Sequence, residues 1–316
     1  MKLTAQQIKD KIKEVLPEGR VVPRHNDKGH FYEILDGVLV NGAPPIYPSV
    51  TGKIAVIKDE GLMNFKMNQA IQYVFRTYKT YNDENIMEHL DKAARASVDI
   101  FEEAGDIGTE VHDTRHRYFQ DWIKTGERPV TFDSYLRPEA VDLRIKSSLR
   151  ALDKFLDDYW YEPIACELFV YSHKLKTCGT LDDLGFIYQF ENKEGHEMNH
   201  EMIRREGDFS CLNCEFKAKR RLALIDLKTS NQFKDHYFFQ VALYWWMLKE
   251  LTGIRPEKCL IVKLSKEDGT PKVEDLKRPS TLASFARSMV RTKTGLEYIR
   301  TLRKDNQKVV APKIEL

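Results

Sequence analysis

Apolar positions along the chain change from helical spacing in the first half to short, strand-like runs in the second half. The first stretch is amphipathic and rich in charged residues, and it predicts a helix that ends near Pro17-Glu18-Gly19. Residues 31–50 predict short strands, because the Asp36-Gly37 and Asn41-Gly42 dipeptides within them favour tight turns. The chain is therefore expected to begin with a helix followed by a small group of strands.

A long helical region is expected before the main strands begin. Residues 52 to about 125 are rich in helical patterns, and Gly126 follows them as a residue type that commonly closes a helix. Pro138 is expected to open a further helix, because proline fits the first turn of helices. Apolar residues recur at helical spacing along that segment: Val141, Ile145, Leu149, Leu152 and Leu156.

The second half of the chain is patterned mainly as strands. Leu222-Ala223-Leu224-Ile225 is wholly apolar, as expected of a strand covered on both faces. The expected elements are strands at 164–172, 180–190, 222–225 and 259–264, a buried helix at 235–251 and a basic helix from about 281 to 304. This order predicts a mixed α/β core with an α-helical N-terminal part packed on it, which divides the chain into residues 1–160 and 161–316.

Composition narrows the class of protein. Of the 316 residues, 42% are hydrophobic and 31% are charged, so the chain can bury a core and remain hydrated. No segment approaches the roughly 18 uninterrupted apolar residues of a membrane span, and the first residues lack the apolar run of a signal peptide. Five cysteines, an odd number in a long chain, argue against a disulfide framework and favour a reducing compartment. We therefore expect a cytoplasmic protein without membrane partners.

The net charge of +2 does not by itself imply a polyanionic partner. Basic residues nevertheless gather in two segments. Residues 284–308 hold seven basic and two acidic residues, with Arg287 and Arg291 on one helical face, and residues 217–221 hold four basic residues. Either segment could contact phosphates, and a solvated basic helix is the alternative interpretation for the first.

Two short motifs in the second half carry candidate chemistry. The first is Gly179-Thr180-Leu181-Asp182, and the second is Ile225-Asp226-Leu227-Lys228. Residues two apart on a strand share a face, so Asp226 and Lys228 are expected side by side. A carboxylate buried next to an apolar strand needs a cation or hydrogen bonds to compensate it. An isolated D-x-K recurs by accident, however, and a solvent-facing pair is then the simpler interpretation.

The surroundings of these motifs favour a functional interpretation. Gln240 and Tyr244 lie four residues apart on the next predicted helix, so they share one face and could point back at the strand end. Upstream, Gly108-Thr109-Glu110-Val111-His112 places a histidine in a predicted helix. A lone helical histidine is usually a surface or core residue, but His112 is one member of an ordered set.

This ordered set resembles the PD-(D/E)xK nuclease superfamily, specifically its RecB-like branch. Tyr47-Pro48-Ser49-Val50-Thr51 is also similar to the mitochondrial genome maintenance exonuclease and its phage and bacterial relatives, so the resemblance spans about residues 40 to 250. It implies a restriction-endonuclease-like core and a bacterial or phage-infected cell as the location. It further implies roles for single residues: metal ligands His112, Asp182, Asp226 and the Leu227 carbonyl, the catalytic Lys228, and Gln240 and Tyr244 on a helix bordering the DNA channel.

The expected activity is metal-dependent hydrolysis of phosphodiester bonds in DNA. Divalent cations activate water, neutralise charge on the phosphate and stabilise the leaving oxygen. Two carboxylates suit Mg²⁺, and His112 shifts the preference toward Mn²⁺. The resemblance favours an exonuclease acting on single-stranded DNA or DNA ends. The alternatives are a structure-specific or restriction-like endonuclease and a catalytically inactive nuclease fold that binds nucleic acid.

The spacing departs from the family pattern in one respect. Asp182 and Asp226 are separated by 44 positions, whereas the family joins these strands by a tight hairpin, so residues 191–221 form an insertion. The register of the two strands therefore stays open, and Asp183 is an alternative to Asp182, because a shift of one residue changes the face. Glu167, on the preceding strand, is either an additional or supporting ligand or a solvent-facing residue.

The insertion contains four residue types that bind zinc. His196-x3-His200 precedes Cys211-x2-Cys214, and both spacings occur in zinc sites. The order is the reverse of the common finger, so zinc is not favoured, and an iron–sulfur cluster is less favoured because only two cysteines cluster. A hairpin continuing the two strands, or a disordered loop, is the alternative. With zinc bound, residues 217–221 are expected beside Asp226 as a wall of the DNA channel.

Overall fold

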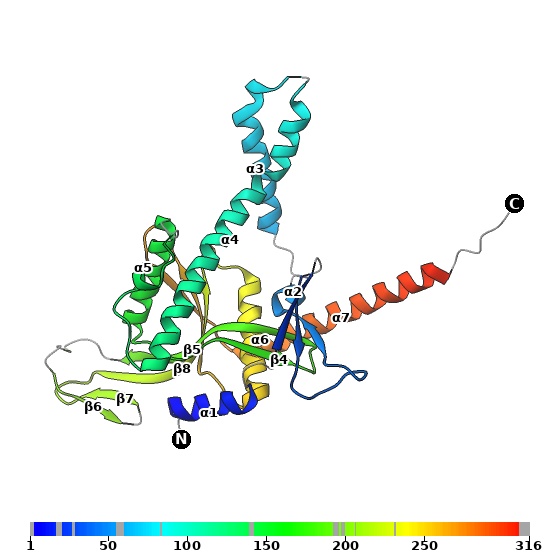
Figure 1. The fold of residues 1–316 in the computed structure, drawn as a ribbon. Helices are drawn as coiled ribbons and strands as arrows, with labels where there is room; N and C mark the ends of the chain where they lie inside the picture. The colour runs from blue at the N-terminus through cyan, green and yellow to red at the C-terminus, as the bar shows by residue number, and fades with distance from the viewer. Residues whose placement is uncertain are drawn as a thin grey trace.

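The computed structural model describes residues 3–16, 21–26, 29–54, 60–82, 84–138, 142–191, 196, 200–205, 207–230 and 232–309. A seven-stranded sheet forms the centre of the fold, with the strand order β10-β9-β8-β5-β4 and with β6 and β7 attached beside β8 (Figure 1). β8 runs parallel to β9, and the other neighbours are antiparallel. The strands are β4 (Glu162–Ser172), β5 (Thr177–Glu191), β6 (Met202–Arg205), β7 (Asp208–Cys211), β8 (Lys217–Lys228), β9 (Lys258–Leu264) and β10 (Pro271–Asp275). The mixed α/β class predicted from the sequence is confirmed.

Two layers of helices cover the sheet, because side chains alternate between the two faces of each strand. Leu222 and Leu224 of β8 pack on one layer, whereas Ala223, Ile225 and Leu227 pack on the other. The first layer contains α1 (Ala5–Val15), α2 (Val50–Ile54), α6 (Asp235–Thr252) and α7 (Pro279–Val309), and the second contains α4 (Ile86–Thr125) and α5 (Leu143–Asp158). Burial on both faces explains why the centre of β8 is wholly apolar.

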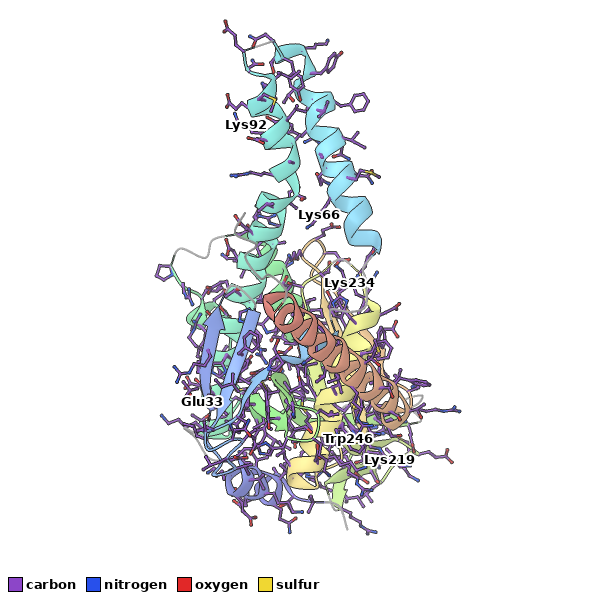
Figure 2. The ribbon with its side chains drawn as sticks, turned by 90° about the vertical axis from the view of Figure 1, so that its right-hand side faces the viewer. Glu33, Lys66, Lys92, Lys219, Lys234 and Trp246 are labelled. Carbon is purple, nitrogen blue, oxygen red and sulfur yellow. The ribbon has the colours of Figure 1, made fainter. Side chains whose placement is uncertain are left out.

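A helical arm projects away from these layers (Figures 1 and 2). It consists of α3 (Glu60–Thr77), the short helix η1 (Tyr78–Thr80) and the first turns of α4, and Lys92 lies toward its outer end. Large apolar side chains remain exposed on it, with Phe75 at 73% and Met87 at 70%. The later part of the same α4 is buried against the sheet. One continuous helix of 40 residues therefore joins the arm to the core.

A small antiparallel sheet near the start of the chain packs beside β4 and β5. Its strands are β1 (Val21–Asn26), β2 (Gly29–Ile34) and β3 (Ile46–Pro48). The Tyr47 hydroxyl lies 2.7 Å from His173 Nδ1, and Asp36 lies 2.7 Å from His173 Nε2. The predicted turn at Asn41-Gly42 is confirmed, because both residues have positive φ angles, 55° and 80°.

The helix boundaries test several of the expectations. The first helix ends at Val15, and the long α4 ends at Thr125 and is capped by Gly126, whose φ of 80° is the left-handed conformation of a helix cap. The prediction that Pro138 opens the next helix is wrong. α5 begins at Leu143, because the Asp142 side chain accepts a hydrogen bond from the Arg144 backbone N–H and caps the helix there. The predicted core residue Val141 lies outside the described residues.

The basic C-terminal helix α7 packs on α6. Ala283, Ala286 and Val290 are fully buried in the same core as α6. The Arg287 guanidinium lies 3.6 Å from the centre of the Trp246 ring, which is labelled in Figure 2. This face of α7 therefore serves packing. Within the described part of the chain, no helix combines the length and the apolar character needed to cross a lipid bilayer.

The predicted insertion continues β5 and β8 as a long antiparallel ribbon. The pairs run from Asp183 with Ile225 to Glu191 with Lys217, which settles the register and confirms the hairpin expectation. β6 and β7 form a hairpin beside the far end of this ribbon (Figure 1). The expectation that residues 217–221 lie beside Asp226 is wrong, because Lys217 is at the opposite end of the same strand, about 30 Å away at ~3.3 Å per residue.

Gly185→Ala should lower the free energy of unfolding by about 1–3 kcal/mol, because the added carbon would overpack the junction of β4 and β5. It would lie 2.5 Å from Tyr161 Cε2 and 2.6 Å from the Glu162 carbonyl oxygen. Gly105→Ala is the matched control, since this exposed helical position of α4 has nothing within 4 Å and should gain about 0.5–1 kcal/mol. Urea unfolding followed by circular dichroism measures both. Equal effects of the two substitutions would contradict the packing described.

Candidate active site

Two of the predicted metal ligands, His112 and Asp182, meet at the centre of the molecule together with Glu167, whose role the sequence leaves open. Asp226, the other predicted carboxylate ligand, lies outside this group. His112 comes from α4, Glu167 from β4 and Asp182 from β5, and one ligand atom of each lies within 4.8 Å of the others. Register places Glu167 opposite Asp182, since the flanking pairs are Cys166 with Asp183 and Leu168 with Leu181. Two carboxylates and an imidazole thus converge from three elements that are distant in the sequence.

Asp182 and His112 both lie against the backbone of Leu227. The Leu227 N–H donates a hydrogen bond of 2.7 Å to Asp182 Oδ2, and His112 Nδ1 lies 3.7 Å from Asp182 Oδ1. Burial lowers the pKa of His112, and this effect is opposed by Asp182 and by a hydrogen bond with the Leu227 backbone. Burial would raise the pKa of Asp182, but His112, Lys228 and Arg115 outweigh it and leave that pKa lowered. Asp182 is therefore a carboxylate at neutral pH.

Asp226 and Lys228 form the ion pair expected from their shared strand face. Lys228 Nζ lies 2.6 Å from Asp226 Oδ2, and Asp226 is almost wholly buried. Burial raises the pKa of Asp226 to about 6, against the opposing effect of Lys228. Burial would lower the pKa of Lys228, but Asp226 and Asp182 outweigh it and raise that pKa. The lysine is therefore held as an ammonium ion, with the Tyr237 ring centre 5.1 Å away.

A buried arginine that the sequence reasoning missed lies beneath these residues. Arg115 has no exposed surface, donates to the Asp182 carbonyl oxygen at 2.8 Å, and lies 2.7 Å from Asp183 Oδ1. It also contacts the Glu167 carboxylate. The available signal was spacing, because Arg115 is three residues after His112 and so shares its helix face. Asp183 is engaged by Arg115, whereas Asp182 faces His112, which supports Asp182 as the metal-facing carboxylate.

Glu167 occupies an unusual backbone conformation within β4. Its φ of 49° is in the left-handed region, which costs a non-glycine residue on the order of 1–3 kcal/mol and is found preferentially at functional sites. Burial raises the pKa of Glu167 to about 7, against the attraction of Arg115. Of the alternatives for this residue, the structure therefore disfavours a purely solvent-facing side chain.

Gln240 and Tyr244 share a face of α6 as predicted, with Gln240 Nε2 donating to the Tyr244 hydroxyl at 3.0 Å. Tyr244 is buried and packs directly on Gly179 of the first motif, where an added Cβ would lie 2.8 Å from the tyrosine ring. In the same way, a Cβ on Gly108 would lie 3.1 Å from the Thr229 hydroxyl. Both motif glycines thus permit close approach between elements that carry site residues.

The charges of the site fit a divalent cation. Four carboxylates gather here, and among the described residues the side chains that pair with them and carry a permanent positive charge are Arg115 and Lys228. Burial raises the pKa of Asp183 to about 7, which indicates incomplete compensation even beside Arg115. Oxygen and imidazole ligands suit Mg²⁺ and Mn²⁺. The carboxylates are Glu167, Asp182, Asp183 and Asp226.

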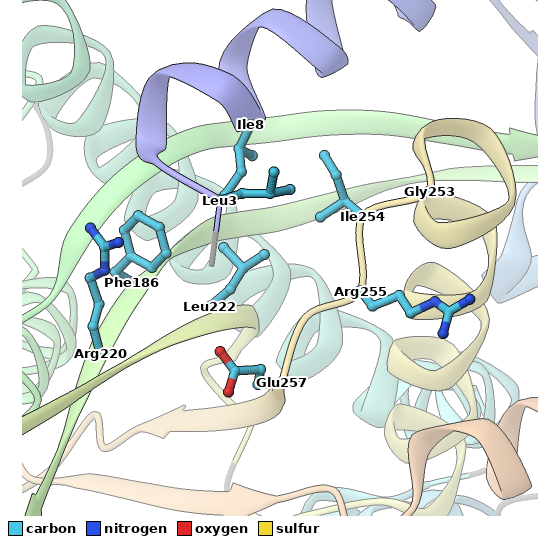
Figure 3. A pocket seen from close by; sticks show the side chains of 9 residues that line it. All are labelled: Leu3, Ile8, Phe186, Arg220, Leu222, Gly253, Ile254, Arg255 and Glu257. Atoms are coloured by element: carbon cyan, nitrogen blue, oxygen red, sulfur yellow. The ribbon is translucent and has the colours of Figure 1, made fainter. Parts of the chain in front are cut away.

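A cavity of about 170 Å³ lies elsewhere, between α1, the β5–β8 pair and the segment after α6 (Figure 3). It is lined by Leu3, Ile8, Phe186, Arg220, Leu222, Gly253, Ile254, Arg255 and Glu257. None of these residues belongs to the carboxylate group, and the Arg220 guanidinium is stacked 4.2 Å from the centre of the Phe186 ring. The cavity is therefore separate from the candidate active site.

Comparison with known proteins does not identify a family. No protein-family model and no curated protein matches the chain. A solved structure titled "Crystal structure of SSO0001" aligns with 60% of this chain and 74% of its own, at 15% sequence identity and a TM-score of 0.24. A likeness at this TM-score carries no argument, so the chemistry of the site is assigned from its own residues.

Arg115→Met should destabilise the protein by about 3–5 kcal/mol, because it leaves buried carboxylates without their cation. Arg137→Met is the matched control. Its guanidinium also pairs with two carboxylates, Asp113 at 2.5 Å and Glu110 at 3.4 Å, but the side chain is 48% exposed, and the loss should be below about 1 kcal/mol. Adding Asp183→Asn to Arg115→Met should restore part of the stability. Chemical unfolding of all variants tests this, and equal losses for the two arginines would refute it.

Proposed function

We propose that this protein is a metal-dependent deoxyribonuclease of the PD-(D/E)xK superfamily, in its RecB-like branch. The observation that supports this most directly is the meeting of residues from α4, β4, β5 and β8 at one point of the fold. Two of their pairings are close: Asp182 with the Leu227 N–H, and Asp226 with Lys228. Residues spread from position 112 to position 228 rarely converge in this combination of types without a shared chemical role.

The candidate metal site consists of acidic and imidazole ligands on rigid elements. His112, Asp182 and Glu167, whose ligand atoms lie together, would hold Mg²⁺ or Mn²⁺. Asp226 and the Leu227 carbonyl would complete the ligand set that the resemblance implies. When bound, such an ion supplies an acidified water and stabilises negative charge on the phosphate and the leaving oxygen. The protein fixes the ligands in place, because three of the four side chains arise from a sheet and the fourth from a helix packed on it.

Lys228 is the residue proposed to act directly on the reaction. Its ammonium group is charged at neutral pH and oriented by Asp226, so it can donate hydrogen bonds to the attacking water and to a phosphate oxygen. Arg115 would act indirectly by holding the Asp182 backbone and the Glu167 carboxylate. Gln240, which is partly exposed and donates to the buried Tyr244, would border the DNA, since their α6 helix lies against the strand that carries Asp182.

The proposed substrate is DNA that has a free end or is single-stranded. With Mg²⁺ or Mn²⁺, linear single-stranded DNA should be degraded, and covalently closed circles should be cut at least about tenfold more slowly. The matched control is the same circle opened by a single cut, which should become a substrate. End-labelled DNA resolved on denaturing gels measures both rates.

Two results of this assay would change the proposal. Cleavage of closed circles at the rate of linear DNA would replace the exonuclease with the endonuclease alternative. Binding without cleavage of any DNA, with either ion, would favour an inactive nuclease fold.

Lys228→Ala should reduce cleavage by about 10²–10⁴-fold while DNA affinity changes only a few-fold, because the lysine acts mainly in the transition state. Asp226→Asn should also abolish cleavage, through lost metal binding. Lys258→Ala is the control, since Lys258 likewise pairs with an aspartate on the sheet, Asp275 at 2.7 Å, but outside the site. Single-turnover rates at saturating protein separate cleavage from binding. Activity within a few-fold of wild type for both site variants would exclude this active site.

A further inference from the structure

A second group of metal-binding side chains lies at the far end of the β5–β8 ribbon. One ligand atom from each of four residues lies within 4.8 Å of the others: His196, His200, Cys211 and Cys214. The histidines come from the segment between β5 and β6, and the cysteines come from the end of β7 and the turn before β8. Sequence reasoning disfavoured zinc because of the order of these ligands, but the fold brings them together regardless of order.

The separation between ligand atoms matches a zinc tetrahedron. With Zn–S near 2.3 Å and Zn–N near 2.0–2.1 Å, a sulfur and a nitrogen on one tetrahedral zinc lie about 3.5–3.6 Å apart. Cys214 Sγ lies 3.5 Å from His196 Nδ1. Two thiols and two imidazoles are the ligand set of structural zinc sites and are too soft for Mg²⁺. The other three cysteines, Cys166, Cys178 and Cys259, belong to β4, β5 and β9, so a four-cysteine iron–sulfur cluster has too few thiolates here.

The turn that carries the cysteines is built to present their sulfur atoms. The Asn213 N–H donates to Cys211 Sγ at 3.3 Å, and the Cys211 N–H donates to the Phe216 carbonyl oxygen at 3.0 Å. The Asn213 side chain in turn accepts from the Glu201 N–H at 3.0 Å. Hydrogen bonds to ligand atoms and the turn beneath them are how proteins orient metal ligands.

Only a small apolar cluster supports this end of the ribbon. Phe216 is buried in it, and the His196 ring stacks on Phe216 with ring centres 4.0 Å apart and an interplanar angle of 8°. The cluster is separate from the two main cores of the sheet. A core of this size is insufficient to order a polar segment of some twenty residues, which small folds achieve with a metal or disulfides.

We propose that a structural zinc ion binds at the far end of the β5–β8 ribbon, held by His196, His200, Cys211 and Cys214. The zinc fixes the β6–β7 hairpin onto β8 and closes the insertion. It lies well away from the carboxylates, because Glu191, where β5 ends, is nine residues and about 30 Å along that strand from Asp182. The zinc site is therefore structural and independent of the proposed nuclease chemistry.

The test uses the full chain, purified without chelators and without a histidine tag. Elemental analysis should find about one zinc per chain, and p-mercuribenzoate should release that zinc from wild-type protein, as read with a colorimetric zinc indicator. Cobalt added to zinc-free protein should give the intense visible absorption and the thiolate charge-transfer band of a tetrahedral site, which carboxylate ligands do not produce. Cys211→Ser with Cys214→Ser should lose the zinc and the charge-transfer band, whereas the control Cys166→Ser should keep both.

Limited proteolysis gives a second readout that does not depend on activity. The double serine variant should be cleaved between residues 191 and 217 at least about tenfold faster than wild type, with the rest of the chain intact. The proposal is overturned by zinc below about 0.2 per chain, by a disulfide between Cys211 and Cys214 in the isolated protein, or by zinc that the double variant retains. Iron with acid-labile sulfide would overturn it as well.

Discussion

The arrangement of the carboxylate site depends on one buried guanidinium. Arg115 has no contact with water, and its charge is balanced by Asp183, Glu167 and the backbone oxygen of Asp182. An unpaired charge at this depth costs several kcal/mol, so α4 cannot move away from β4 and β5 without that penalty. His112 lies one turn before Arg115 on the same helix. The ion pairs that hold the arginine therefore also fix the imidazole relative to the carboxylates.

The same contacts shift the pKa values of the four carboxylates in different directions. Burial raises the pKa values of Glu167, Asp183 and Asp226, whereas the pKa of Asp182 is lowered by the three basic groups around it. One carboxylate is thus firmly ionised, and the others are poised to take up either a proton or a cation. In the proposed metal site, a divalent ion would compete with protons for these carboxylates, which is the linkage expected of metal ligands in a folded scaffold.

The spacing of apolar residues predicts most of the helices and strands. The features that it does not predict depend on particular side-chain contacts. The apolar centre of β8, the buried α6 helix and the cap at Gly126 follow from local spacing and residue type. The prediction placed the start of α5 at Pro138, but the helix begins at Leu143 because the Asp142 side chain caps it there. Asp182, Asp226 and Lys228 came from short motifs. Arg115 did not, because an arginine on a helix looks like a surface residue until the strands that bury it are in place.

The proposed zinc site in the insertion illustrates the same limit. Ligand order along the chain argued against zinc, but the four side chains are brought together by the long pairing of β5 with β8 and by the hairpin attached to it. A hairpin continuing the two strands was one open alternative for residues 191–221, but their few apolar positions could not fix its register or show which side chains it brings together. The order of metal ligands along the chain helps to predict a metal site only when all the ligands lie in one local turn.

The continuous α4 helix has a mechanical consequence. Ile86, where the helix begins, precedes His112 by 26 residues, or about 39 Å at 1.5 Å per residue. A tilt of about 5° around the buried half of α4 would therefore move the outer end of the arm by roughly 3 Å, while His112 would shift by only a fraction of that distance. A tilt of α4 would therefore move the exposed arm far more than it moves His112, which lies in the buried part of the helix. The Arg115 ion pairs and the packing of Val111, Tyr118 and Phe119 in the core would together resist such a tilt.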